Sequence, residues 1–352
     1  MIIGSKHIKN TSMTHRFPIK EIARQAGLGP ATIDRVLNNR ANVSAQTKQR
    51  VAAAIEELTA QEAQLAARGR RMFFDFVIEA PARFSREVRT AAEAVLPHIS
   101  TAVCRPRFLL QEIMEEVEVV AALQRIHKRG SQGVCLKAKD TPVIRDAVRK
   151  LHAAKIPVVT LVTDIGGGDR LSYVGLDNEG AGRTAAYLIS KILGNRSGAV
   201  LATRSHERFL GEEDRERAFT EALSKLSPNL QVISLQGGGG VHSKTVNQLA
   251  PKLSSVADLQ AVYSMGGGNK AILETLEHCR LNPLIYVAHD MDRENKELLL
   301  NEKINFVLNH DLQRDIRAAF DHFLAFHKLI SEPTTEAVST VQILTPMNVP
   351  AA

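Results

Sequence analysis

The chain has 352 residues, with 45 Lys and Arg against 38 Asp and Glu, and a formal net charge of +7 at pH 7. This length predicts two or three domains with a sizeable core, and 44% hydrophobic residues argue against global disorder. No apolar run reaches the ~18 residues of a membrane span, and the first residues lack the apolar region of an export signal. We therefore expect a cytoplasmic protein without a membrane partner.

The three cysteines, Cys104, Cys135 and Cys279, lie far apart and show no metal-ligand spacing. A reduced compartment is expected, with neither a metal site nor a cofactor.

The positive charge is concentrated at the start of the chain. Residues 1–71 hold twelve Lys and Arg but five acids, and the remaining 281 residues hold 33 of each sign. This distribution predicts a small basic module, suited to a polyanion such as nucleic acid, joined to a neutral body.

The basic module begins with a polar stretch without periodicity, which we interpret as a flexible leader over residues 1–16. Three helices are predicted over 19–26, 30–38 and 45–58, so that residues 17–58 form one domain. Pro30 suits the first turn of the second helix, and Ser44 suits the N-cap of the third.

From residue 73 onward short apolar runs alternate with helical stretches. Strands are predicted over 73–78, 133–136, 157–161, 173–176, 199–202, 231–235, 261–264, 284–288, 306–308 and 338–344, about eleven in all. Such alternation predicts parallel sheets with helices on both faces, here as two Rossmann-like lobes with a cleft between them. The lobes are expected over about 73–175 with 310–345, and about 176–309 with 346–352.

The first two predicted helices, separated by residues 27–29 at the basic end of the chain, indicate a helix-turn-helix. The second helix would lie in the major groove of DNA with Arg35 facing the base edges. Residues 18–38, PIKEIARQAGLGPATIDRVLN, resemble the N-terminal signature of the LacI/GalR family of bacterial repressors nearly position for position. The resemblance implies DNA contacts by Ile19, by Pro30, Ala31 and Arg35 at the bases, and by Thr32, Asn38 and Ser44 at phosphates.

Two residues depart from the family pattern in this motif. Gly29 stands where a Ser or Thr cap is usual, and Asp34 stands where a phosphate-contacting Ser is common. Because phosphates repel a carboxylate, we expect Asp34 to hold Arg35 or another partner side chain.

Residues 59–72 occupy the place of the family's hinge helix, which forms on DNA and inserts a leucine into the minor groove. The segment 59–69, TAQEAQLAARG, lacks the family's Tyr, Pro and Asn, and Gly69 falls at the leucine position. Leu65 would reach the groove only in a shifted register, so a plain helical linker is the alternative.

The body resembles the sugar receptors of the ribose-binding type that this family carries as effector domains. The resemblance rests on PVVTL at 157–161, on YVGLDNEGAGR at 173–183, on the offset between Arg215 and Phe219, and on Asp290 directly after a strand. It implies a fold of two lobes with a small ligand between them.

A sugar offers CH faces and hydroxyls, so its site needs aromatic rings together with Asp, Asn and Arg side chains. The predicted effector contacts are Phe84, Arg86, Thr163, Asp164, Asn178, Arg208, Arg215, Gly267, Asn269, Asp290 and His310. Phe84 is alternatively a core residue, and Arg215 is alternatively part of an exposed charge run.

The glycine-rich segments at 236–240 and 266–269 replace side chains that sugar-binding relatives usually offer. The ligand is therefore either a sugar or polyol, or an anion such as a sugar acid or sugar phosphate. An enzyme is the alternative class, but neither a complete nucleotide-binding loop nor a GxSxG motif is present, so no catalytic residue is assigned.

Together these features predict a homodimeric transcriptional repressor that binds a pseudo-palindromic operator and responds to a small effector between its lobes. Corepression and activation remain open alternatives.

Overall fold

The computed structural model describes residues 16–67, 71–205, 209–236, 242–335 and 337–349, with the side chains of 63–67 outside this description. Two compact units divide the chain, Met1–Arg70 and Arg71–Ala352, which we call the head and the body. The predicted leader lies outside the described residues except for Arg16.

The head contains the predicted helix-turn-helix. Helix α1 (Ile19–Ala26) ends at Gly27, whose φ of 60° is left-handed, and α2 (Pro30–Leu37) follows with its proline in the first turn. These helices pack on α3 (Ala45–Ala67) around the buried side chains of Phe17, Ile22, Ile33, Val51 and Leu58.

Helix α3 is longer than predicted and includes most of the expected linker. It continues past Leu58 to Ala67, and β1 begins at Arg71, earlier than the expected residue 73. Residues 59–67 are mostly Ala, Gln, Glu and Leu, with no Gly or Pro, so nothing in this segment ends a helix. The side chain of Leu65 lies outside the described residues, and Gly69 does too.

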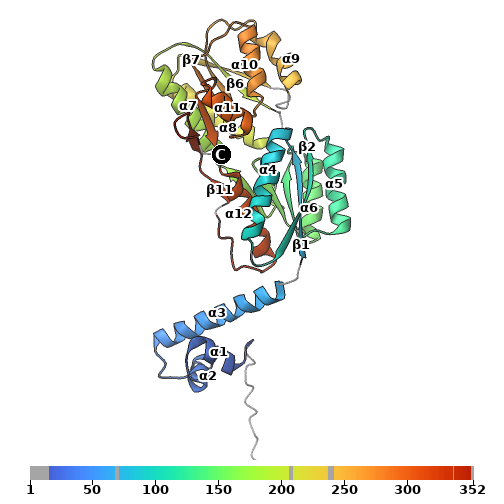
Figure 1. Ribbon diagram of the computed structural model, residues 1–352, viewed down its shortest axis with the longest axis vertical. Coiled ribbons are helices and arrows are strands. Elements are labelled where there is room, and N and C mark those ends of the chain that lie inside the picture. The colour runs from blue at the N-terminus through green and yellow to red at the C-terminus, as the bar shows by residue number, and fades with distance from the viewer. Residues whose placement is uncertain (1–15, 68–70, 206–208, 237–241, 336, 350–352) are drawn as a thin grey trace, which may run out of the picture. The chain divides into compact units, whose positions relative to one another are not determined.

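The body is an α/β structure of two lobes, as predicted (Figure 1). The sheet of lobe 1 has the order β11-β5-β4-β3-β1-β2, and all its pairs are parallel. Its elements are β1 (Arg71–Glu79), α4 (Ala82–Val95), the short 3-10 helix η1 (Leu96–His98), β2 (Val103–Gln111), α5 (Glu116–Arg129), β3 (Gly133–Lys137), α6 (Pro142–Ala153), β4 (Val158–Leu161), β5 (Ser172–Leu176), α12 (Leu312–Phe326) and β11 (Val338–Ser339).

The sheet of lobe 2 has the order β12-β10-β9-β8-β6-β7, in which only β12 is antiparallel to its neighbour. Its elements are α7 (Asn178–Leu193), β6 (Gly198–Arg204), α8 (Leu210–Leu226), β7 (Leu230–Gln236), α9 (His242–Leu253), β8 (Leu259–Ser264), α10 (Asn269–His278), β9 (Ile285–His289), α11 (Arg293–Leu300), β10 (Phe306–Asn309) and β12 (Gln342–Leu344).

Each lobe buries apolar side chains on both faces of its sheet. In lobe 1 one cluster includes Phe74, Phe320 and Phe323 beneath α4 and α12, and the other lies beneath α5 and α6. In lobe 2 the two clusters lie beneath α7 with α8, and beneath α9, α10 and α11. This layering explains why the strands are continuous apolar runs rather than alternating ones.

Three segments connect the lobes: β5 to α7, β10 to α12, and β11 to β12. The third differs from the prediction, because the single strand expected over 338–344 is two short strands in different sheets. The chain therefore returns to lobe 2 between Ser339 and Gln342, before the expected residue 346.

Strand β2 and helix α5 were not predicted. Strand β2 lies at the edge of its sheet and contains two arginines and a proline, so it lacks the apolar run of a central strand. Among the described residues, no helix is long and apolar enough to cross a membrane, and no group of three or more His, Cys, Asp or Glu side chains is arranged to hold a metal ion.

We predict that Gly133→Ala lowers the stability of lobe 1. A Cβ atom at Gly133 would come within 2.5 Å of the ring of Phe323, which stacks on Phe74 with ring centroids 5.1 Å apart. Overpacking of this kind typically costs about 1–3 kcal/mol. Thermal unfolding followed by circular dichroism should show a lower Tm. Gly168→Ala is the matched control, because its Cβ would meet no atom within 4 Å; equal Tm values for the two variants would contradict the packing described here.

Candidate functional site

The second helix of the head presents its first turn and its arginine to solvent. Pro30, Ala31 and Arg35 are exposed and Thr32 is half-buried, whereas Ile33 is fully buried against α1 and α3. Exposure on one face and packing on the other allow α2 to enter a major groove without loss of the core. Ile19 differs from these residues, since its half-buried side chain packs against the apolar cluster of the head.

Asp34 holds two neighbours of Arg35 rather than Arg35 itself. Its Oδ1 accepts a hydrogen bond from Nδ2 of Asn38 at 2.8 Å, and its Oδ2 lies 3.3 Å from Nη1 of Arg40. Within the described residues the guanidinium of Arg35 makes no hydrogen bond or ion pair, so its donors remain available to base edges.

Ser44 caps α3, as its sequence position predicts. Its Oγ accepts a hydrogen bond from the backbone N–H of Thr47 at 3.1 Å while the residue stays exposed. The first turn of α3 is thereby held beside an exposed hydroxyl, which suits a phosphate contact.

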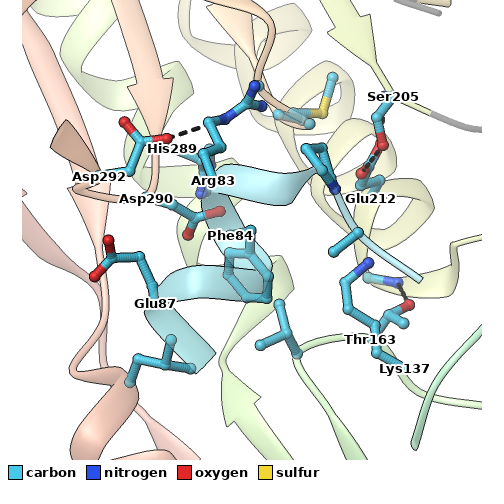
Figure 2. A pocket seen from close by; sticks show the side chains of 18 of the residues that line it. Arg83, Phe84, Glu87, Lys137, Thr163, Ser205, Glu212, His289, Asp290 and Asp292 are labelled. Atoms are coloured by element: carbon cyan, nitrogen blue, oxygen red, sulfur yellow. Dashed lines mark hydrogen bonds and ion pairs between the residues drawn. The ribbon is translucent and has the colours of Figure 1, made fainter. Parts of the chain in front are cut away.

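A cavity of about 980 Å³ lies between the lobes of the body. It is placed by the strand order, because both sheets have the doubly wound order in which the first strand lies between the second and third. In such sheets ligands bind outside the carboxyl ends of the strands, where the direction of the connections reverses. In Figure 2, Asp290, Phe84 and Glu87 lie toward one end of the cavity, with Lys137, Thr163 and Glu212 toward the other.

Asp290 lines this cavity directly after β9. Its backbone has a φ of 64°, a left-handed conformation that costs energy for a residue other than glycine. The backbone is held by Asn295, whose Nδ2 donates to the carbonyl oxygen of Asp290 at 2.7 Å. Burial alone would raise the pKa of this carboxyl, but contact with His310 and the charge of Arg215 lower it well below its usual range. The carboxylate of Asp290 is therefore charged in the folded protein near neutral pH.

His310 lines the cavity beside Asp290, with its Nε2 3.5 Å from Oδ1 of that residue. Its Nδ1 makes a short hydrogen bond with Oδ2 of Asp315. Burial by itself lowers the pKa of His310, but the two carboxylates outweigh that effect and raise the pKa to about 9. The imidazole is therefore a buried cation near neutral pH.

Arg215 is a buried cavity residue, 3% exposed, and not part of an exposed charge run. Its Nε donates to Oδ1 of Asn178 at 2.7 Å, and its Nη1 donates to the carbonyl oxygen of Met265 at 2.8 Å. Asn178 in turn donates to the hydroxyl of Tyr173 at 2.9 Å. Asn178 does not line the cavity, and the contacts show that it orients Arg215 instead.

Three further predicted residues lie in the wall of the cavity. Phe84 is half-buried, lines the cavity and also packs against the apolar cluster of lobe 1. Thr163 accepts a hydrogen bond from the backbone N–H of Gly211 at 3.1 Å, which joins the lobes. Gly267 has a φ of 79°, and a Cβ there would meet Nη2 of Arg83 at 2.0 Å.

Three other predicted effector residues, Asp164, Asn269 and Arg86, do not line the cavity. Asp164 is held by Arg170, whose Nε and Nη2 donate to its two oxygens, and by Thr160. Asn269 is 1% exposed and bonds to Asn295 and Tyr286 inside lobe 2. A separate pocket of about 240 Å³ is lined by Arg86, and Arg208 lies outside the described residues.

Asp164 lies away from the cavity for a simple physical reason. Thr163 follows β4 at the cleft, and the next residue turns away into the loop that leads to Arg170. The carboxylate of Asp164 therefore anchors this loop and does not face the cavity.

Sequence reasoning missed the charged residues of the opposite wall. Glu79 ends β1 and Lys137 ends β3, while Glu212 lies in the first turn of α8. All three line the cavity and are at most 8% exposed. Glu79 and Lys137 could have been found by the rule that identified Asp290, because a charge at the end of a buried strand is seldom idle.

Lys137 reaches from lobe 1 to residues of lobe 2. Its Nζ donates to the carbonyl oxygen of Glu79 at 3.0 Å and lies 3.8 Å from the ring centroid of Phe209. Burial lowers the pKa of this lysine, and the charges of Glu212 and Glu79 oppose that change. Glu212 itself accepts from the backbone N–H of Ser205 at 2.6 Å.

Two protein-family models match the chain. Residues 18–59 match the model for bacterial regulatory proteins of the lacI family, and residues 116–321 match a periplasmic binding protein domain. The second match covers more than half of the chain.

Among curated proteins, the ribose import binding protein RbsB of Salmonella typhimurium is 26% identical over 145 residues, which is 41% of this chain and 48% of that protein. The transcriptional regulator TreR of the same organism is 26% identical over 132 residues, which is 38% of this chain and 34% of TreR. The matches thus span about half of RbsB and about a third of TreR.

Among solved structures, a LacI transcriptional regulator from Bacteroides fragilis superposes with a TM-score of 0.69 at 14% identity, over 79% of this chain and 98% of that one. This likeness shows the fold of the body. The head and the body are thus matched by separate family models: the body belongs to the periplasmic binding protein domain family, and the head is a DNA-binding domain of the lacI family of bacterial regulatory proteins.

Proposed function

We propose that this protein is a transcriptional regulator whose affinity for operator DNA is set by a neutral sugar or polyol bound in the cavity of the body. The observation that carries the proposal is the cavity between the lobes. Residues of both lobes line it, and Asp290 and Arg215 are among them. The same chain carries a helix-turn-helix head with an exposed Arg35. The similarity to RbsB, a ribose import binding protein, supports a sugar as the ligand.

The charges of the cavity favour a neutral ligand over a sugar acid or phosphate. Its wall contains three ion pairs: Arg83 with Asp292 at 2.9 Å, Lys139 with Glu79 at 3.0 Å, and His310 with Asp290 at 3.5 Å. Lys137 has carboxylates on both sides, Glu79 and Glu212. An anionic ligand would meet the carboxylates of these pairs as well as their cations in a partly desolvated site, whereas hydroxyls exchange hydrogen bonds with both.

The proposed response is repression that the ligand relieves. A ligand that contacts both lobes favours one lobe arrangement over another, and a shift in that equilibrium changes operator affinity by the same coupling free energy. About 1–3 kcal/mol is typical of such coupling. Two chains related by two-fold symmetry would place their heads on the two half-sites of an operator.

The ligand class is tested with a thermal-shift panel on the full chain. We expect D-ribose, D-glucose or myo-inositol to raise Tm, by a stabilisation of about 2.7 kcal/mol at a concentration 100 times Kd. Ribose 5-phosphate and gluconate should have no such effect, because carboxylates already pair with Arg83, Lys139 and His310 in the cavity wall. Stabilisation by the anions alone would contradict the neutral ligand.

The DNA-binding face is tested with Arg35→Ala. Operator sequences are first selected from random DNA with the wild-type chain, and affinities are then measured at fixed salt. Loss of one base-contacting arginine should cost about 1–3 kcal/mol and relax the preference at one position of each half-site. Arg149→Ala, an exposed arginine of the body, serves as control and should bind like wild type. An unchanged sequence preference in Arg35→Ala would refute this assignment of α2.

The cavity is tested with Asp290→Asn. The change removes the charge that faces the cavity, so affinity for the stabilising sugar should fall at least about tenfold, as measured by calorimetry. Operator affinity without sugar should stay within about twofold of wild type, because the head is unaltered. Asp164→Asn is the matched control, since that carboxylate bonds to Arg170 away from the cavity. A control variant that lost sugar affinity as strongly as Asp290→Asn would contradict the site.

A further inference from the structure

Three charged side chains in contact with one another, Asp290, His310 and Asp315, link the wall of the cavity to both lobes, and the last two are buried. Asp290 follows β9 in lobe 2, His310 lies on the segment that connects β10 to α12, and Asp315 lies in the first turn of α12 in lobe 1. The histidine and Asp315 have side chains that are 2% and 0% exposed. The chain of contacts therefore runs from one lobe, through a connecting segment, to the other.

We infer that Asp315 is a positioning residue for effector binding, which holds His310 as a cation oriented toward Asp290 and so ties the cavity carboxylate to the lobe arrangement. The inference rests on the proposed function, and it assigns a role to a residue that lies outside the cavity wall.

The geometry of the imidazole carries the argument. Because Nδ1 is engaged by Asp315, the other ring nitrogen, Nε2, is the one that faces the cavity and Asp290. A histidine with a carboxylate on one nitrogen has its ring plane and its protonation state fixed by that partner. Among the described residues Oδ1 of Asp290 has no hydrogen-bond partner, and its contact with Nε2 of His310 at 3.5 Å is an ion pair.

The position of Asp315 makes the restraint sensitive to lobe movement. The carboxylate lies near the N-terminus of α12, whose Ile316 and Phe320 belong to the apolar cluster of lobe 1. Asp290 is held in lobe 2 by the backbone hydrogen bond of its N–H to Leu308 and by Asn295. A change in the angle between the lobes therefore changes the distance between His310 and at least one of its two partners, Asp290 and Asp315.

The charged surroundings of the histidine determine its response to pH. Asp315 on α12 and Asp290 after β9 face it directly, and His289 on β9 and Arg215 on α8 act on Asp290. The folded pKa of His310, about 9, lies above the ordinary value of 6.5. Its contribution to stability is thus complete below about pH 6.5 and is lost as pH rises through about 9.

The experiment compares the full wild-type chain with Asp315→Asn and His310→Gln between pH 6.5 and 10. Both variants lack the paired imidazolium, so the difference in Tm from wild type should be largest near neutral pH and should shrink as wild type loses its own proton. Using two variants guards against misfolding of one of them. The matched control is Glu274→Gln, which removes the carboxylate of the exposed pair His242–Glu274, 2.8 Å apart, and should keep the wild-type profile.

The second readout is affinity at pH 7 for the neutral sugar, D-ribose, D-glucose or myo-inositol, that stabilises wild type most. Asp315→Asn should bind it about tenfold more weakly, although its side chain does not contact the cavity, and Glu274→Gln should bind it normally. If the Tm difference between Asp315→Asn and wild type did not change with pH, the charged pair His310–Asp315 would be contradicted. A pH-dependent difference with unchanged sugar affinity would overturn the positioning role and leave a purely structural pair.

Failure of the proposed function gives a different result. If no neutral sugar bound to the wild-type chain, the positioning role would fall with it, but the pH profile of Asp315→Asn would still report the His310–Asp315 contact. The two readouts therefore distinguish an incorrect ligand class from an incorrect arrangement of Asp290, His310 and Asp315.

Discussion

Parallel strands all end at the same edge of their sheet, and this constraint places the charged residues at the strand ends, Glu79, Lys137 and Asp290, around one cavity. Glu79 and Lys137 end the neighbouring strands β1 and β3 of one sheet, and Asp290 follows β9 of the other. The two lobes bring these strand ends to one cavity, from which water is partly excluded. Charges in such a space need partners, which explains the ion pairs Arg83–Asp292 and Lys139–Glu79.

Ligand contacts and lobe connections share residues in this protein. Arg215 is oriented by Asn178 at the start of α7, where the first connecting segment ends, and Asp290 contacts His310 on the second. A group that binds in the cavity therefore acts on segments that also determine the angle between the lobes. This arrangement suits a switch, because a ligand shifts a conformational equilibrium only through contacts that differ between the two states.

Much of the fold followed from local pattern, and the errors have identifiable causes. Buried parallel strands are apolar runs, so most were predicted, but β2 is a polar edge strand and was missed. Residues 59–67 contain no helix breaker, so α3 continued through the expected linker. Among site residues, Asp164 and Asn269 have the right chemistry, yet they face Arg170 and Asn295. Periodicity cannot show which way a loop turns after a strand ends.

The sequence by itself determined the helix-turn-helix and the family, because the residues of 18–38 combine spacing, apolar phase and a turn glycine that a short segment fixes locally. It also determined that the body is α/β with parallel sheets. Only the tertiary structure decided which charges meet: Asp34 with Asn38 and Arg40, Lys137 with Phe209, and Asp315 with His310. The contact of Lys137 with Phe209 joins segments distant in the chain, whereas the contacts of Asp34 and Asp315 span at most six residues. The energies of all these contacts depend on burial, which no local pattern specifies.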